Sequence, residues 1–332
     1  MKKIAIIVMA ENFSGVGFVA PVFVSVIKQV ATVFSEEIIG PVTELELTGV
    51  LERLRPDENA LVISTKTPFI TSGECGRLFE KLNEKNRVLY AENEYDGPVV
   101  QNARDAVDAL TALRKKKNEE LLKKGVLLLD PERTYIDPDV TIGEGTVIHP
   151  NNTISGGSTI GKNCVLLPNS RIHASVIADG VRIESSVLTE CSVMEESAIG
   201  PFAYLRPKAA VGRRCRVGDF VEIKNSSIGD DTKVSHLTYV GDSDLGQRIN
   251  LGCGVVFVNY DGKKKFRSHV ADDAFIGCNV NLVSPVEVGE GAYVAAGSTV
   301  TEDVPGGALV IARARQSVKE GWVEARKKEG KL

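Results

Sequence analysis

The stretch TIGEGTVIHPNNTISGGSTIGKNCVLLPNSRI at residues 141–172 decides the fold, because an aliphatic residue recurs in it at every sixth position. The spacing begins at Ile136 and continues to Val300, with several one-residue slips and one longer interruption. Glycine often follows the aliphatic residue. A period of six fits neither a helix of about 3.6 residues per turn nor an alternating strand of this length.

This period predicts a parallel β-helix, in which each hexapeptide forms a short strand and a corner, and three hexapeptides make one triangular coil. A β-sandwich is the alternative, but it would not keep a six-residue register over so many residues. Burial of each aliphatic side chain contributes about 1.5–3 kcal/mol before conformational entropy is counted, so a charge in the series should disrupt the stack. The series is Ile136, Ile142, Ile148, Ile154, Ile160, Leu166, Ile172, Ile177, Ile183, Leu188, Val193, Ile199, Leu205, Val211, Val217, Ile223, Ile228, Val234, Val240, Leu245, Leu251, Phe257, Val270, Ile276, Leu282, Val288, Val294 and Val300.

The interruption lies between Phe257 and Val270, where the step is 13 residues and the register requires six. The segment VNYDGKKKFRSH (258–269) must therefore leave the coil as a loop. Loops on a rigid scaffold commonly carry function, and the amide, aromatic ring and cations of this one suit a phosphorylated or nucleotide-bearing ligand. A solvated insertion without function is the alternative.

The chain before the β-helix shows an α/β pattern. Buried strands are expected at IAIIVMA (4–10), ENALVIST (58–65) and RVLYAE (87–92), and helical segments at 42–55 and 73–85. A charged helix at 102–125, which ends at Gly125, is expected to connect the two parts, with its basic run RKKK as a solvated face.

Composition excludes several classes of protein. The net charge of −4 over 332 residues argues against nucleic acid as a partner. No apolar run reaches the roughly 18–20 residues that span a bilayer. The two leading lysines and the apolar run after them faintly resemble a signal peptide, but Glu11 soon breaks the run, so we interpret it as the first strand of a cytoplasmic domain. The six cysteines show no CxxC or CxxH spacing, which indicates reduced thiols rather than a zinc site or disulfides.

Several long motifs occur in order along the second part of the chain. They are GPFAYLRPKAAVG (200–212), VGDFVEIKNSSIGD (217–230), SHLTYVGDSDLG (235–246), NLGCG (250–254), VNYDGKKKF (258–266), FIGCNVNLVSPVEVGEGAYVAAGSTVTEDVP (275–305) and IARARQ (311–316). Over roughly 100–332 the sequence closely resembles the acetyltransferase half of the bifunctional UDP-N-acetylglucosamine pyrophosphorylase / glucosamine-1-phosphate N-acetyltransferase family. The resemblance implies a left-handed β-helix, a homotrimer with sites between subunits, and transfer of acetyl from acetyl-CoA to the amine of glucosamine-1-phosphate in UDP-N-acetylglucosamine synthesis.

The expected chemistry needs a proton acceptor, because an amine that attacks a thioester must shed a proton. A histidine titrates near pH 6.5 and can accept it. His236 lies two residues past the inward-pointing Val234 and matches the general base of the family. The other histidines, His149, His173 and His269, fall outside the matching motifs and are expected to be surface residues.

The resemblance also implies roles for eleven further residues. The substrate-binding set is Arg206 and Lys224 for the phosphate, with Tyr239 and Asn250 orienting the sugar. The coenzyme-binding set is Cys253, Asn259, Tyr260, Lys265, Cys278, Ala296 and Arg313. Two thiols in this set raise the alternative of a covalent acyl-cysteine route, which we disfavour because many relatives have alanine or serine there.

The N-terminal part departs from the family. It lacks the arginine of the nucleotide-binding loop and has Val22 in place of the lysine after the proline. In LVISTKTPFI (61–70), Lys66 replaces a metal-binding aspartate and would repel Mg²⁺. We therefore expect a shortened relic without pyrophosphorylase activity and without a metal site. The alternatives are a full bifunctional enzyme and a non-catalytic trimeric scaffold.

These expectations divide the chain into four parts. A shortened nucleotidyltransferase-like α/β domain is expected at 1–101, a linker helix at 102–130, the left-handed β-helix acetyltransferase domain at 131–312, and a C-terminal tail at 313–332.

Overall fold

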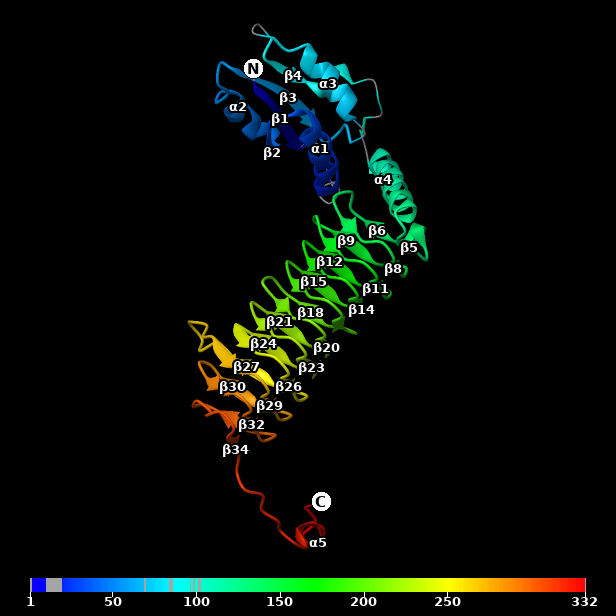
Figure 1. The fold of residues 1–332 in the computed structure, drawn as a ribbon. Helices are drawn as coiled ribbons and strands as arrows, with labels where there is room; N and C mark the ends of the chain where they lie inside the picture. The colour runs from blue at the N-terminus through cyan, green and yellow to red at the C-terminus, as the bar shows by residue number, and fades with distance from the viewer. Residues whose placement is uncertain are drawn as a thin grey trace.

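The computed structural model describes residues 2–9, 20–68, 70–83, 86–95, 97, 99–100 and 103–331. Its first part is an α/β unit built on a four-stranded parallel sheet of order β2-β1-β3-β4 (Figure 1), which confirms the α/β prediction. The elements are β1 Lys2–Met9, α1 Ala20–Phe34, β2 Glu37–Thr43, α2 Glu44–Leu51, β3 Glu58–Ser64, α3 Ser72–Glu80, β4 Val88–Tyr90 and the 3₁₀ helix η1 Ala91–Glu94.

Helices cover both faces of this sheet. One face packs Ile7 and Leu61 against Ile27 of α1 and Phe79 of α3, and the other packs a second cluster against α2. The sequence pattern predicts neither α1 nor β2. Helix α1 is rich in β-branched residues, and β2 contains Gly40-Pro41, which is typical of a turn; packing and parallel pairing with β1 override these local preferences. The sequence predicts that the nucleotide-binding loop of the family has lost its arginine and lysine here. Residues 10–19 of that segment, and the side chain of Val22, lie outside the described residues.

Helix α4 (Ala103–Lys123) connects the two parts of the chain and covers the open end of the β-helix. Its first half packs Ala106 and Ala109 against Phe23, and Leu121 joins the β-helix core. The Lys117 ammonium group donates hydrogen bonds to the carbonyl oxygens of Pro138 (3.0 Å) and Val140 (2.7 Å). The terminal coil, which has no neighbour on that side, thus receives a cap. None of the helices in the described ranges is long and apolar enough to cross a membrane.

The second part is a left-handed parallel β-helix with three sheets, which we call A, B and C (Figure 1). Sheet A contains β7 Thr141–Ile142, β10 Thr159–Ile160, β13 Val176–Ile177, β16 Ser192–Val193, β19 Ala210–Val211, β22 Ser227–Ile228, β25 Ser243–Leu245, β28 Ser268–Val270 and β31 Glu287–Val288. Sheet B contains β5 Leu127–Leu128, β8 Val147–Ile148, β11 Val165–Leu166, β14 Arg182–Ile183, β17 Ala198–Ile199, β20 Arg216–Asp219, β23 Lys233–His236, β26 Asn250–Leu251, β29 Phe275–Ile276, β32 Tyr293–Val294 and β34 Leu309–Val310. Sheet C contains β6 Tyr135–Ile136, β9 Thr153–Ser155, β12 Arg171–His173, β15 Val187–Thr189, β18 Tyr204–Leu205, β21 Glu222–Lys224, β24 Tyr239–Gly241, β27 Val256–Val258, β30 Asn281–Val283 and β33 Thr299–Val300.

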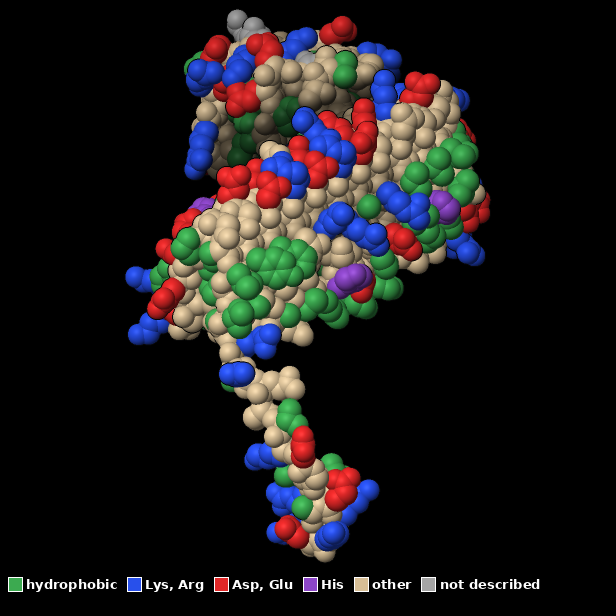
Figure 2. Space-filling model, turned by 60° about the horizontal axis from the view of Figure 1, so that its bottom comes forward, with side chains coloured by type: hydrophobic (Ala, Val, Ile, Leu, Met, Phe, Trp, Pro, Cys, Tyr) green, Lys and Arg blue, Asp and Glu red, His purple; other side chains and the backbone are tan. Residues whose placement is uncertain are grey.

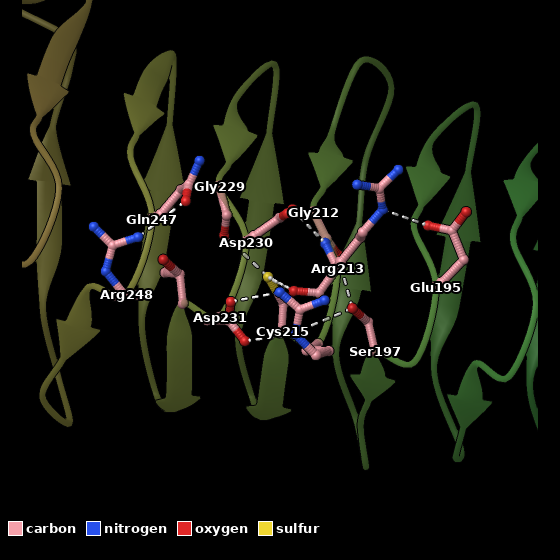
Figure 3. Close-up of polar contacts among 12 residues, drawn as sticks. Glu195, Ser197, Gly212, Arg213, Cys215, Gly229, Asp230, Asp231, Gln247 and Arg248 are labelled. Atoms are coloured by element: carbon pink, nitrogen blue, oxygen red, sulfur yellow. Dashed lines mark hydrogen bonds and ion pairs between the residues drawn. The ribbon is translucent and has the colours of Figure 1, made fainter.

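The interior of the β-helix confirms the predicted aliphatic series, because every member of it from Ile136 to Val300 is buried. A second inward position precedes many of these residues by two and takes small side chains. Three cysteines occupy it, namely Cys164, Cys191 and Cys215. Polar residues at this position bond to the backbone of the next coil: the Ser197 hydroxyl donates to the carbonyl of Gly212 (2.7 Å) and accepts from the amide of Cys215 (2.9 Å) (Figure 3).

Charged side chains of opposite sign face one another between coils at the corner between sheets A and B (Figure 3). Arg213 Nε contacts Glu195 at 3.0 Å, and Arg214 contacts Asp231 through two hydrogen bonds of 2.7 and 2.8 Å. One coil further on, Arg248 pairs with Asp273. Figure 2 shows acidic and basic side chains alternating along one edge of the β-helix. We call Glu195, Arg213, Arg214, Asp231, Arg248 and Asp273 the corner ladder.

The predicted loop leaves the β-helix between β27 and β28. An isolated antiparallel bridge joins Tyr260 to Lys265, and the Asp261 carboxylate accepts the backbone N–H groups of Lys263 (2.7 Å) and Lys264 (2.6 Å). The loop therefore has a defined hairpin conformation. After β34 the chain extends away from the β-helix and ends in α5 Trp322–Lys328 (Figure 1).

Candidate active site

Five of the residues of interest form a vertical column at the corner between sheets B and C, one in each of five successive coils. They are Asp219, His236, Cys253, Cys278 and Ala296. Backbone hydrogen bonds join each member to the next coil, where the residue that follows the next member donates its N–H to the member's carbonyl. Leu237 donates to Asp219 (2.9 Å), Gly254 to His236 (3.4 Å), Asn279 to Cys253 (2.8 Å) and Gly297 to Cys278 (2.8 Å). We call this set the corner column.

The column brings residues that are far apart in the sequence into one line on the surface. The loop accounts for the long step from Cys253 to Cys278, because it adds residues without adding a coil. Arg313 lies beside the end of the column, since Cδ of its side chain lies in van der Waals range of a Cβ placed on Gly297. All these side chains are outside the β-helix interior.

His236 is held by a carboxylate that the sequence motifs do not reveal. Its Nδ1 lies 2.6 Å from Oδ1 of Asp219, and the two residues are register partners in β23 and β20. The hydrogen bond from His236 is the largest of the effects that hold the pKa of Asp219 below its ordinary value. An ionised carboxylate can only accept, so Nδ1 carries the proton and Nε2 is left with a free lone pair. The imidazole is 53% exposed and can meet a ligand.

A cluster of cations lies on sheet C. Arg206 Nη1 donates to Glu222 at 2.7 Å, and Lys224 Nζ is 3.6 Å from Oδ2 of Asp242. Lys265, on the loop, contacts Lys224, and this contact with a second ammonium group lowers the pKa of Lys265. Cations this close together can bind a multiply charged anion.

Asp242 connects this cation cluster to the loop. Its buried carboxylate accepts 2.6 Å hydrogen bonds from the amides of Asn225 and Asn259, in addition to the contact with Lys224. Burial alone would raise the pKa of Asp242, but Asn225, Lys224 and Asn259 outweigh burial, so that the pKa is below its ordinary value. Asp242 therefore holds one residue of each predicted binding set.

Gly241 makes this arrangement possible. A side chain at Gly241 would overlap the hydroxyl of Tyr239 and the amide of Asn259. These two groups lie 3.4 Å apart above the glycine. A residue larger than glycine would displace one of them.

The structure thus brings the predicted residues together in two groups and leaves two apart. The corner column contains His236, Cys253, Cys278 and Ala296, with Arg313 beside its end. The second group is the cation cluster of Arg206, Lys224 and Lys265, together with Tyr239 and Asn259. Asn250 lies on sheet B, paired with Lys233 and Phe275. Tyr260 is exposed and donates its hydroxyl to the Gly262 carbonyl (2.7 Å).

The corner column lies at the edge of sheet C that adjoins sheet B, and Arg206 and Lys224 lie at the opposite edge, toward sheet A. The strands of sheet C separate the two edges, and the three residues of β24 span about 10 Å at 3.3 Å per residue. Asp219 and Asp242 are the residues that motifs alone do not identify. The signal that finds Asp219 is the coil length: counting back 17 residues from His236, one coil with a slip, gives Asp219.

No group of three or more histidine, cysteine or acidic residues within the described ranges has an arrangement that could hold a metal ion. Lys66, at the carboxyl end of β3, lies 3.7 Å from Glu92.

Comparison with known proteins shows which proteins this chain is similar to. The family described as "Bacterial transferase hexapeptide (six repeats)" matches residues 267–302. The "Bifunctional protein GlmU" of an Exiguobacterium species is 53% identical over 231 residues, which cover 69% of this chain and 51% of that protein. The protein of the same name from Clostridium acetobutylicum is 53% identical over 212 residues, which cover 64% of this chain and 46% of that protein.

The chain belongs to the GlmU family. It spans about half the length of the curated relatives that it matches. Among solved structures, a UDP-N-acetylglucosamine acyltransferase from Campylobacter jejuni shows 18% identity and a TM-score of 0.42, covering 53% of this chain and 71% of that one. The acetyltransferase domain of PglB from Neisseria gonorrhoeae shows 14% identity and a TM-score of 0.13, covering 93% and 95%.

Proposed function

We propose that this member of the GlmU family is an acyltransferase that transfers acetyl from acetyl-CoA to the amine of glucosamine-1-phosphate, as a step in UDP-N-acetylglucosamine synthesis in the cytoplasm. The observation that most supports this function is the 2.6 Å contact between His236 and Asp219 at the exposed corner of the β-helix. It leaves an imidazole nitrogen free to accept a proton where the corner column meets solvent.

His236 is the general base. The sugar amine attacks the thioester carbonyl as a neutral group, and Nε2 of His236 takes the proton that the nitrogen loses as the new bond forms. Asp219 holds the ring and stabilises the resulting imidazolium. The products are the N-acetylated sugar phosphate and the free coenzyme thiol.

The cation cluster binds the phosphate. Arg206 can hold it through two parallel hydrogen bonds, while Lys224 supplies a compact charge. Lys265, which the family resemblance assigns to the coenzyme, contacts Lys224 and is placed here with the sugar phosphate. A phosphate between the two lysines relieves their mutual repulsion, which the lowered pKa of Lys265 indicates. Tyr239 and Asn250 orient the sugar ring.

The coenzyme lies along the corner column. Cys253, Cys278, Ala296 and the neighbouring glycines Gly254 and Gly297 have small side chains or none, which leaves room for an extended ligand beside the coil. Backbone N–H groups at this edge can hold the thioester oxygen. Asn259, Tyr260 and Arg313 complete the coenzyme contacts.

The separation of the two groups by sheet C supports a site shared between subunits, in the homotrimer that the family resemblance implies. Within one chain, His236 and the cation cluster lie at opposite edges of sheet C, so one substrate that reaches both is better held between two chains. We therefore place each site between subunits, with the loop of one chain near the corner column of the next.

The N-terminal unit carries no pyrophosphorylase activity in this proposal and needs no Mg²⁺. Lys66 is paired with Glu92 at the carboxyl edge of β3, where the family has a metal-binding aspartate. The alternatives are a full bifunctional enzyme, which would release pyrophosphate from UTP with magnesium, and a non-catalytic trimeric scaffold.

The test is a coenzyme-thiol release assay with acetyl-CoA and a panel of acceptors: glucosamine-1-phosphate, glucosamine-6-phosphate and unphosphorylated glucosamine. The proposal expects release with glucosamine-1-phosphate and little with glucosamine, because only the phosphate engages the cation cluster. Equal rates with and without the phosphate would refute the assignment of that cluster, and no release with any acceptor would favour the scaffold.

A further inference from the structure

Two cysteines of the corner column are direct neighbours in adjacent coils. Strand β26 pairs in register with β29, and the amide of Asn279 donates to the carbonyl of Cys253 at 2.8 Å. Cys253 and Cys278 are therefore separated by one interstrand spacing, about 4.8 Å. This lies within the range of about 4.4–6.8 Å between Cα atoms that a disulfide bridges.

Side chains at adjacent levels of this column can reach each other. Asp219 and His236, two levels below Cys253 and Cys278 respectively, make a direct 2.6 Å contact across one coil. Both thiols are free and lie outside the interior, Cys278 being exposed and Cys253 partly exposed.

The other four cysteines differ from this pair. Cys75, Cys164, Cys191 and Cys215 are buried. Burial raises the pKa of Cys75 to about 12 and that of Cys191 to about 11, and raises those of Cys164 and Cys215 in the same direction. Since the thiolate is the reactive form, these four are protected from thiol chemistry.

We propose that Cys253 and Cys278 form a dithiol modification site whose reaction partner is a small-molecule disulfide. The more exposed thiolate, that of Cys278, attacks one sulfur of the small disulfide, forms a mixed disulfide and expels one small thiol. The Cys253 thiolate then attacks Sγ of Cys278 and expels the second small thiol. Two protein thiols are oxidised to one Cys253–Cys278 disulfide, and one small disulfide is reduced to two thiols.

The stoichiometry of reaction with dithiobis(nitrobenzoate) tests this directly on the folded full-length chain. With one equivalent of reagent, the proposal expects two equivalents of the coloured thiolate, and an intact mass that shows the loss of two hydrogens and no adduct. Peptide mapping should find Cys253 joined to Cys278. The variants Cys253→Ser and Cys278→Ser should each release one equivalent and keep a stable adduct, because the second attack is missing.

Three results would overturn the proposal. They are adducts retained on both cysteines of the wild-type protein, a disulfide that involves one of the buried cysteines, and a folded protein that does not react. Each has a clear mass signature, and none depends on enzyme activity.

A second readout rests on the proposed function. Because the pair lies where the coenzyme is placed, closing the disulfide should lower acetyl transfer on the order of tenfold or more, with recovery on addition of dithiothreitol. Each variant is compared with its own reduced sample, so any effect of the serine itself cancels. If the reduced wild-type protein transfers no acetyl group, the proposed function fails while the dithiol site still stands or falls on the stoichiometry alone.

Discussion

Replacing Asp242 tests whether the two binding groups are joined as the structure indicates. Its buried carboxylate accepts the amides of Asn225 and Asn259 at 2.6 Å each. In Asp242→Ala the amide of Asn259, which is only 6% exposed, loses its short hydrogen bond, whereas Asn225 is partly exposed and can bind water. A buried polar group without its partner, here Asn259, costs about 1–3 kcal/mol, and a hydrogen bond that water can replace, here that of Asn225, costs about 0.5–1.5 kcal/mol. The free energy of unfolding should therefore fall by about 2–4 kcal/mol.

Asp242→Asn separates the charge from the shape of the side chain. The asparagine keeps one acceptor oxygen but replaces the other with an NH₂ donor, which then faces the donor of a neighbouring amide. We therefore expect the free energy of unfolding to fall by about 1–2 kcal/mol at neutral pH. The pKa of Asp242 is depressed in the folded protein. Its ionic contribution is therefore complete above the unfolded-state pKa of about 3.9 and is lost as the pH falls through the lower folded-state pKa. The gap between wild type and Asp242→Asn should narrow below about pH 4.

Urea unfolding at pH 7 and at about pH 3 measures both effects. The matched control is Asp273→Asn, which removes the exposed carboxylate that pairs with Arg248 and should have little effect. The reasoning is refuted if Asp242→Asn is no more destabilising than the control at pH 7, or if its gap from wild type widens on acidification.

Three further predictions concern the core, the base and the corner ladder. Leu188 is completely buried, so Leu188→Ala should cost about 2–5 kcal/mol in denaturant unfolding, while Leu188→Met should cost under about 1.5 kcal/mol; equal losses would contradict the packed interior. Asp219→Asn should lower kcat about tenfold to a hundredfold with an unchanged KM for the sugar phosphate, because Asp219 orients His236 without touching that substrate; a change confined to KM would count against this role. Arg214→Glu should destabilise the protein more at low than at high ionic strength, because it opposes Asp231, whose pKa the present ion pair lowers. Above the unfolded-state aspartate pKa, the Arg214–Asp231 ion pair contributes its full stability, and this stability is lost as the pH falls through the depressed folded-state pKa of Asp231. A destabilisation by Arg214→Glu that does not depend on salt at neutral pH would exclude the electrostatic explanation.

The β-helix was predictable because its period is local. Each of the predicted aliphatic residues, such as Leu188 or Phe257, is buried at the same position of its hexapeptide. A step of 13 residues is too long for one hexapeptide, so the extra residues must leave the coil. The loop between Val258 and Ser268 follows directly from that count.

The partners of the site residues were not predictable in the same way. The contact of Asp219 with His236 depends on which coils contain a one-residue slip, and Asp242 is recognisable as a connecting residue only when Asn225, Lys224 and Asn259 meet around it. In the N-terminal unit, α1 and β2 form against their local sequence preferences, because the sheet and its packing determine them. Long-range pairing is the information that a local pattern lacks.

The most direct test of the proposed chemistry is the rate of coenzyme-thiol release by His236→Ala, with His149→Ala as the control for loss of a histidine outside the corner column. With acetyl-CoA and glucosamine-1-phosphate both saturating, we expect His236→Ala to be slower than wild type by about 10²–10⁴-fold, the usual contribution of a general base, and His149→Ala to be unaffected. Turnover by His236→Ala close to that of the wild-type protein would remove this imidazole from the mechanism.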